Sequence, residues 1–146
     1  MTKSRTFSAI ALIGGLLFVD PPPAHAEMGG AGCVSGPQQL IVCASYTATP
    51  VPATAVVAVH FTCSAHSGGV WTGIDTCWFF RNGIRRATAV PLVNPAPGAT
   101  NVATSSLTVA PGQFDLCVLG YVRDAFGAVT WAPYSQTLYC VPLEWG

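Results

Sequence analysis

The sequence predicts an all-β domain, a sandwich of about eight short strands held together by disulfides. Short segments rich in Val, Thr and aromatic residues alternate with Pro, Gly and Asn turns, and no segment after residue 26 keeps a helical period. All six cysteines also lie after residue 26. An even number of cysteines in an exported chain predicts three disulfides, and no pair has the C-x2-C spacing of a structural zinc site.

The first 26 residues are predicted to be a secretory signal peptide. Lys3 and Arg5 form a basic start, and Phe7–Val19 is an apolar run of 13 residues. Ala24-His25-Ala26 then places small residues at the two positions that signal peptidase reads. The run is too short to span a bilayer. We therefore expect a secreted, extracellular protein that begins at Glu27, with no membrane insertion.

The remaining residues, 27–146, have the length of one domain. Their four arginines and five acidic residues leave a net charge of −1 with neutral histidines. Such a surface has no clustered cations for nucleic acid or anionic membrane, so neither is expected as a partner. The segment Glu27–Gln38 is Gly-rich and expected to be loosely held except at Cys33, with the β-sandwich occupying residues 39–146.

Strands are expected in order along residues 39–146. The seven segments, the last interrupted by Pro133, are Leu40–Thr47, Val56–Ser64, Ile74–Arg81, Arg85–Val93, Ser105–Val109, Phe114–Arg123 and Val129–Val141. Pro50-Val51-Pro52 ends the first, and the second alternates most clearly, with Phe61 and Cys63 on one face. Asn82-Gly83 is a two-residue hairpin turn after the third. Proline and glycine separate the later strands.

The order Cys63, Trp78, Cys117 resembles the Cys…Trp…Cys spacing of immunoglobulin-like domains. The segment P-G-Q-F-D-L, residues 111–116, is similar to the turn into strand F of bacterial immunoglobulin-like sandwiches. The resemblance covers about Val56–Val118. It implies an immunoglobulin-like sandwich and, as one alternative, a Cys63–Cys117 disulfide through the core against Trp78.

A second disulfide set follows from the expected strand faces. Burying an unpaired carboxylate is costly, so we expect Asp115 to face water. Its neighbours Phe114, Leu116 and Val118 would then face the core, and Cys117 would point outward. Trp78 and Phe80, assigned to the core, would turn Cys77 outward as well. Strands C and F are neighbours in an immunoglobulin-like sheet, so Cys77 and Cys117 would pair, leaving Cys43–Cys63 and Cys33–Cys140. This set is slightly favoured, and sequential pairing would count against both.

No motif specifies a reaction, a metal or a cofactor. In His60-x-x-Cys63-x-x-His66, residues three apart on a strand point to opposite faces, so His60 and Cys63 are not expected to share a metal. The sequence has no G-x-S-x-G nucleophile elbow, and its few acids are scattered. The chain is therefore expected not to be an enzyme.

Aromatic residues outside the expected core are the candidate binding residues. Trp71 lies in a Gly-rich connection, while Trp131 and Tyr134 flank Pro133. They can form a contact platform or simply pack over the ends of the sandwich. The first hypothesis is a non-catalytic extracellular binding or interaction module for a protein or a cell-surface glycan. The alternative is an inhibitor of a secreted hydrolase that presents the loop Asn94–Asn101.

Overall fold

The computed structural model describes residues 28–91, 96–133 and 135–145. The predicted signal peptide, Tyr134 and part of the loop Asn94–Asn101 lie outside these residues. The described residues form strands and no helix, which confirms the all-β class. The strands are β1 (Met28–Ser35), β2 (Ile41–Pro50), β3 (Val57–His66), β4 (Trp71–Arg81), β5 (Ile84–Thr88), β6 (Asn101–Val109), β7 (Gly112–Arg123), β8 (Val129–Ala132) and β9 (Tyr139–Trp145).

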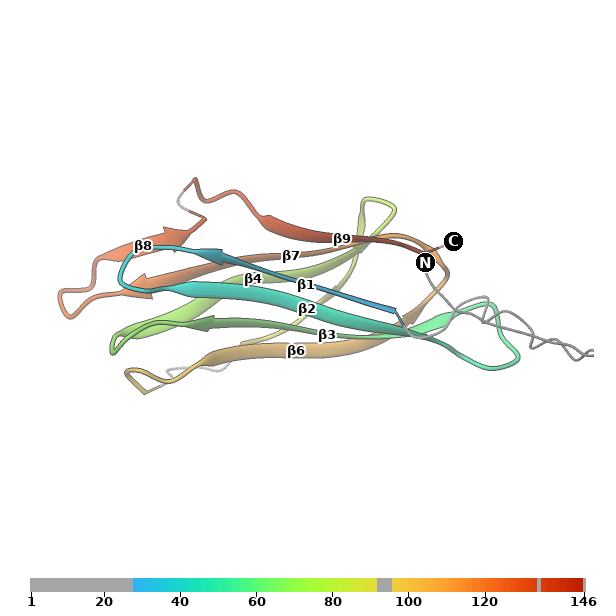
Figure 1. The fold of residues 1–146 in the computed structure, drawn as a ribbon, viewed down its shortest axis with the longest axis horizontal. Helices are drawn as coiled ribbons and strands as arrows, with labels where there is room; N and C mark the ends of the chain where they lie inside the picture. Colours follow the sequence, from blue (N-terminus) through green and yellow to red (C-terminus); the bar gives the residue numbers. More distant parts are fainter. Residues whose placement is uncertain (1–27, 92–95, 134, 146) are drawn as a thin grey trace, which may run out of the picture.

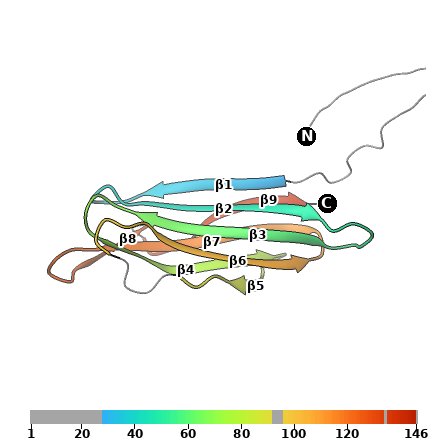
Figure 2. The ribbon, with the colours of Figure 1, turned by 90° about the horizontal axis from the view of Figure 1, so that it is seen from below.

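Two antiparallel sheets pack face to face (Figures 1 and 2). The first has the strand order β1-β2-β3-β6, and the second has the order β5-β4-β7-β8, with β9 also paired to β7. β4 and β5 form the hairpin that Asn82-Gly83 predicts, and both turn residues have positive φ angles of 50° and 80°. The break at Pro133 divides the last expected strand into β8 and β9.

The core lies between the two sheets. The strands β2 and β3 each bury every second residue, as the period-two pattern predicts. Phe79 of β4 sits at the centre, with ring centroids 5.6 Å from Phe61 of β3 and 5.2 Å from Phe114 of β7. All three side chains are fully buried. Burying each one stabilises the fold by about 1.5–3 kcal/mol.

The assignment of Trp78 and Phe80 to the core was wrong. Both are half-buried on the outer face of the second sheet, while Cys77 and Phe79 point into the core. Cys77-Trp78-Phe79-Phe80 is apolar at every position, so its period does not determine which alternate residues face inward. A β-bulge between Ile74 and Thr76 also shifts the register of β4 against β7, and it reverses the alternation part-way along the strand.

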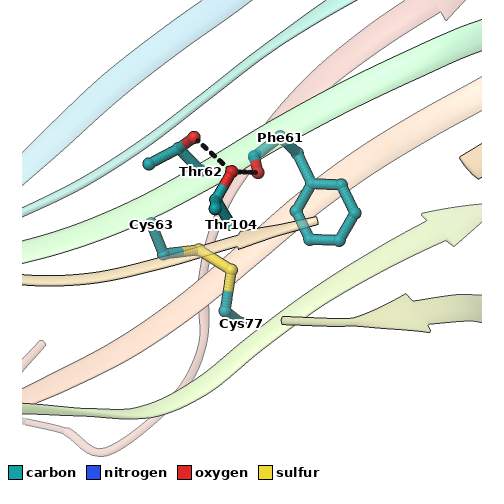
Figure 3. The surroundings of a disulfide bond; sticks show 5 residues. All are labelled: Phe61, Thr62, Cys63, Cys77 and Thr104. Carbon is teal, nitrogen blue, oxygen red and sulfur yellow. Dashed lines mark hydrogen bonds between the residues drawn. A yellow bond between two sulfur atoms is a disulfide. The ribbon is translucent and has the colours of Figure 1, made fainter. Parts of the chain in front are cut away.

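All six cysteines are disulfide-bonded, as expected, but the pairing is sequential. Both predicted sets were therefore wrong. Cys33 lies directly opposite Cys43 on β1 and β2, and Cys117 lies opposite Cys140 on β7 and β9. Cys63–Cys77 links the two sheets inside the core, beside Phe61 (Figure 3).

The errors in pairing come from two features, the direction of Cys77 and the strand β1. Phe114, Leu116 and Val118 do face the core, Asp115 is half-buried on the outer face, and Cys117 is on that outer face too. The partner assignments failed because Cys77 points inward and because β1 was not expected. The Gly-rich segment predicted to be loose instead forms β1, an edge strand paired along its whole length with β2.

Candidate binding surface

Among the residues that the structure describes, formal charge is confined to the second sheet and its turns. The strands β1, β2, β3 and β6 contain no Arg, Lys, Asp or Glu. His60 and His66 are therefore the only side chains of these four strands that can carry a positive charge. The arginines and acids of the described residues lie in residues 71–91 and 112–145, on the second sheet and its turns. The two outer faces therefore offer different chemistry.

Five aromatic side chains share the outer face of the second sheet, and we call them the aromatic surface: Trp71, Trp78, Phe80, Tyr121 and Trp131. They lie on β4, β7 and β8, which are neighbours in the sheet (Figure 1). Trp71 is 37% exposed, and the other four are half-buried. Since side chains of the same face stand on alternate residues, the surface extends along β4 for roughly 30 Å.

One half of the aromatic surface is built around Tyr121. Gly73, Tyr121 and Trp131 lie opposite one another on β4, β7 and β8. The Tyr121 ring lies over Gly73, where any Cβ would overlap with it, and its edge meets the Trp131 ring at a centroid distance of 5.4 Å. Trp71 occupies the adjacent position along β4, opposite Arg123. Rings held by such contacts are preorganised for stacking.

The other half combines two aromatic rings with a cation. Trp78 and Phe80 meet edge to face, with ring centroids 6.2 Å apart. The guanidinium carbon of Arg85, on β5, lies 4.6 Å from the centre of the Trp78 ring. This cation–π contact holds Arg85 over the sheet, so its N–H groups remain available to a ligand beside the rings.

Polar side chains and a disulfide lie among the rings. Asp115 of β7 stands opposite Phe80, and the Thr76 hydroxyl donates a hydrogen bond of 2.8 Å to the carboxylate of Asp75. The Cys117–Cys140 disulfide connects β7 to β9 on this same outer face. The surface can therefore stack on flat apolar groups and exchange hydrogen bonds at the same time.

Phe126 extends the aromatic residues beyond the sheet. It occupies the turn between β7 and β8 and is 96% exposed. The carboxylate oxygen Oδ1 of Asp124 accepts hydrogen bonds from the backbone N–H groups of Phe126, at 2.9 Å, and Ala128, at 3.0 Å. This arrangement holds the turn in one shape and presents Phe126 to solvent. The sequence-based predictions did not include Phe126 among the candidate binding residues.

The outer face of the first sheet carries hydroxyl groups instead of aromatic rings. His60 lies 2.9 Å through Nδ1 from the Ser106 hydroxyl and 3.3 Å through Nε2 from the Thr104 hydroxyl. Thr104 also donates to the backbone carbonyl of Phe61 at 3.0 Å (Figure 3). An open depression of about 370 Å³ follows this face beside Thr47.

This arrangement does not assemble hydrolytic or metal-binding groups. A serine nucleophile needs a histidine whose second nitrogen faces a carboxylate, and here a threonine occupies that place. His60 points outward, as predicted, whereas Cys63 is buried in its disulfide with Cys77. In the part of the chain that the structure describes, no three His, Cys, Asp or Glu side chains are grouped as metal ligands would be.

The structure brings two of the three predicted site residues onto one surface. Trp71, expected in a loop, is the first residue of β4, and Trp131 lies in β8, two strands away. Tyr134 is outside the described residues. Sequence reasoning missed Tyr121 and Arg85, and it placed Trp78 and Phe80 in the core. Only the register of β4 against β7 shows that these residues share a face.

Comparison with family models, curated proteins and solved structures gives no significant match. Among the described residues, no helix is long and apolar enough to cross a membrane.

Proposed function

We propose that the two sheets form an immunoglobulin-like sandwich. The strand order supports this: β2-β3-β6 faces β5-β4-β7-β8, which corresponds to strands A-B-E facing C′-C-F-G. β1 would be an additional strand beside A. Two departures distinguish the chain from antibody domains, because Cys63 bonds to Cys77 on the adjacent strand in sequence and Trp78 lies on the outer face.

We propose further that the protein is exported and acts outside the cell. Three disulfides support an oxidising compartment, since thiols are kept reduced in the cytosol. The basic, apolar and A-x-A features of residues 1–26 agree with that compartment.

We propose that the protein is a non-catalytic module that binds extracellular glycan through the aromatic surface. The observation that carries this proposal is the arrangement of five aromatic rings with Arg85, Asp75 and Asp115 along one open sheet face. A sugar ring has an apolar face of C–H groups and a rim of hydroxyls. The former stacks on aromatic rings, and the latter exchange hydrogen bonds with charged and hydroxyl side chains.

Other ligand classes fit this surface less well. The described arginines of the second sheet are balanced by acids, so the surface lacks the net positive charge that nucleic acids require. Small molecules favour concave sites that bury most of their surface, whereas this face extends along a strand. A polymeric chain of sugars matches an extended, open surface. The inhibitor hypothesis remains a sequence-based prediction, since its loop Asn94–Asn101 lies partly outside the described residues.

Retention on insoluble polysaccharides tests the proposed function. The exported protein is mixed with microcrystalline cellulose, chitin and bacterial peptidoglycan, and the unbound fraction is measured. We expect retention on at least one polymer. Trp71→Ala and Trp131→Ala should each weaken binding about tenfold, corresponding to about 1.4 kcal/mol for a lost stacking contact.

The matched control is Ile41→Ala, which removes an exposed apolar side chain from the opposite outer face. This variant should bind like the wild-type protein. Absence of retention on all three polymers, or equal weakening by Ile41→Ala, would contradict the proposal. Co-purification with a secreted hydrolase and loss of that enzyme's activity would favour the inhibitor hypothesis instead.

A further inference from the structure

The free edges of the two sheets differ in how they are protected from pairing with other strands. An exposed edge presents unpaired N–H and C=O groups, and proteins usually block it with charges, prolines or covering segments. On the second sheet, β5 carries Arg85 and Arg86, both exposed. The opposite edge has Pro133 directly after β8 and Pro142 within β9. Both edges of the second sheet are therefore protected.

The first sheet has one protected and one unprotected edge. At the β6 edge, Pro91 forms a β-bridge with Ala103, so a neighbouring segment covers part of the strand. At the other edge, β1 has β2 as its sheet neighbour and contains neither proline nor a charged side chain in residues 28–35. Within the described residues, β1 is thus the edge that lacks all three common protections.

β1 is nevertheless held in place as an ordered strand. The Cys33–Cys43 disulfide fixes it to β2, and its eight residues pair in unbroken register. Its inward side lies over the second sheet, where a Cβ at Gly32 would overlap with the Tyr139 hydroxyl. A strand so constrained has little backbone entropy left to lose when it pairs with another strand.

We propose that β1 pairs antiparallel with β1 of a second copy of this chain, joining the two four-stranded sheets edge to edge. Two identical antiparallel strands are related by a two-fold axis perpendicular to the sheet, so outward residues must meet outward residues. On β1 the exposed, outward positions include Gly29, Ala31 and Cys33. A register centred on Ala31 or on Gly32 satisfies this rule and keeps roughly seven residue pairs.

A second copy fits this edge because the first sheet is self-compatible. With no Arg, Lys, Asp or Glu in β1, β2, β3 or β6, two such sheets meet without repulsion between like charges. On the outward face Cys33, bonded to Cys43, stands opposite Gly29 in the register centred on Ala31 and opposite Ala31 in the register centred on Gly32. A small residue therefore faces the disulfide in either register.

The dimer has a consequence that rests on the proposed function. Because the axis is perpendicular to the joined sheet, the second sheets of both copies lie on the same side of it. Their aromatic surfaces then face in the same direction and can engage one polysaccharide surface together. Such bivalent engagement strengthens retention without any new contact.

Sedimentation equilibrium of the exported protein over a range of concentrations tests the dimer. We expect the wild-type protein to show a monomer–dimer equilibrium. Ala31→Lys and Ala31→Glu should each raise the dimer dissociation constant at least about tenfold, because like charges then oppose each other near the axis. An equimolar mixture of the two variants should restore dimers, since opposite charges then face each other.

The matched control is Ala58→Lys, which places the same charge on the outer face of the central strand β3, where Ala58 is exposed. It should leave the dimer unchanged. A monomer at every concentration, a dimer that both Ala31 variants preserve, or a mixture that stays monomeric would overturn the proposal.

Polysaccharide binding separates this proposal from the proposed function. Ala31→Lys should reduce retention on an insoluble polymer but leave the affinity for a soluble oligosaccharide unchanged. If the wild-type protein dimerises through β1 and binds no polymer, the glycan proposal fails and the dimer stands. If the monomeric variant is retained as strongly as the wild-type protein, the bivalent engagement is wrong.

Discussion

Tyr46 lies in a buried environment that makes its phenol harder to ionise than that of an exposed tyrosine. Its side chain is 3% exposed, packs edge to face against Phe79, and donates a hydrogen bond of 3.4 Å to the backbone carbonyl of Val141. Burial raises the pKa of the Tyr46 phenol well above its usual range, and the negative charge of Asp115 raises it further. The folded protein therefore holds Tyr46 protonated at pH values where the unfolded chain has lost that proton.

The stability of the fold should consequently fall as the pH rises above about 10, where an unfolded tyrosine ionises. Below that pH Tyr46 is protonated in both states, so its contribution is fully present. Above it, the free energy of unfolding should decrease by up to about 1.4 kcal/mol per pH unit from this residue. All six cysteines are oxidised, so thiol ionisation adds nothing. Urea unfolding at pH 7 and pH 11 measures the difference.

Tyr46→Phe provides the comparison. At pH 7 this variant should lose about 1 kcal/mol or less, since a single long hydrogen bond is removed. Between pH 7 and pH 11, the free energy of unfolding of this variant should fall by less than that of the wild-type protein. Equal losses in the two proteins would show that Tyr46 does not cause the alkaline instability.

At the scale of the strand, β4 shows where sequence patterns are informative and where they are not. The strand itself and its Asn82-Gly83 hairpin were predicted, because β-branched and aromatic residues precede a strong turn. Its inward residues were not, because Cys77 to Phe80 is apolar throughout and the bulge after Ile74 reverses the alternation. The polar and apolar alternation of β3, by contrast, correctly grouped Phe61 and Cys63 on one face, and that face is the buried one.

β1 shows the opposite limit. Its composition, with three glycines in eight residues, predicts a loose segment. The strand forms by pairing along its whole length with β2, and a glycine suits its inward side, because a Cβ at Gly30 would stand 3.3 Å from the Tyr46 ring of β2. The candidate site likewise could not be predicted in full without knowing which strands pair in the sheet. Trp71 and Trp131 were identifiable as unassigned aromatics, but Tyr121 joins them only through the pairing of β7 with both β4 and β8.

The Cys63–Cys77 disulfide should contribute more to stability than the Cys33–Cys43 disulfide does. It closes a sequence separation of 14 residues, for which the chain-entropy model gives about 3 kcal/mol. Both cysteines are also buried between the sheets, so Cys63→Ala/Cys77→Ala leaves a cavity in the core as well. The midpoint of urea unfolding measures the loss.

Cys33→Ala/Cys43→Ala is the comparison, because it removes a disulfide of similar separation, 10 residues, from the outer face of the first sheet. It should cost less than the core variant, since both cysteines lie on the outward face and no core cavity forms. A core variant as stable as this edge variant would show that the inter-sheet disulfide is not important for packing.

At the scale of the whole molecule, the two sheets divide the surface into different chemistries. The first sheet presents hydroxyl groups, no formal charge and an unprotected edge, whereas the second presents aromatic rings, arginines and carboxylates. A shared core centred on Phe79 holds the two faces rigidly back to back. Self-association at the β1 edge and ligand binding on the aromatic surface can therefore take place together without competing for the same residues.

Nuclear magnetic resonance identifies the ligand-binding face directly. Isotope-labelled protein is titrated with soluble oligosaccharide fragments of cellulose, chitin and peptidoglycan. We expect the indole N–H signals of Trp71 and Trp131 to shift with the backbone signals of β4, β7 and β8, while those of β2 and β3 stay in place. No shift with any of the fragments, or shifts confined to the hydroxyl-bearing face around His60, would contradict binding through the aromatic surface.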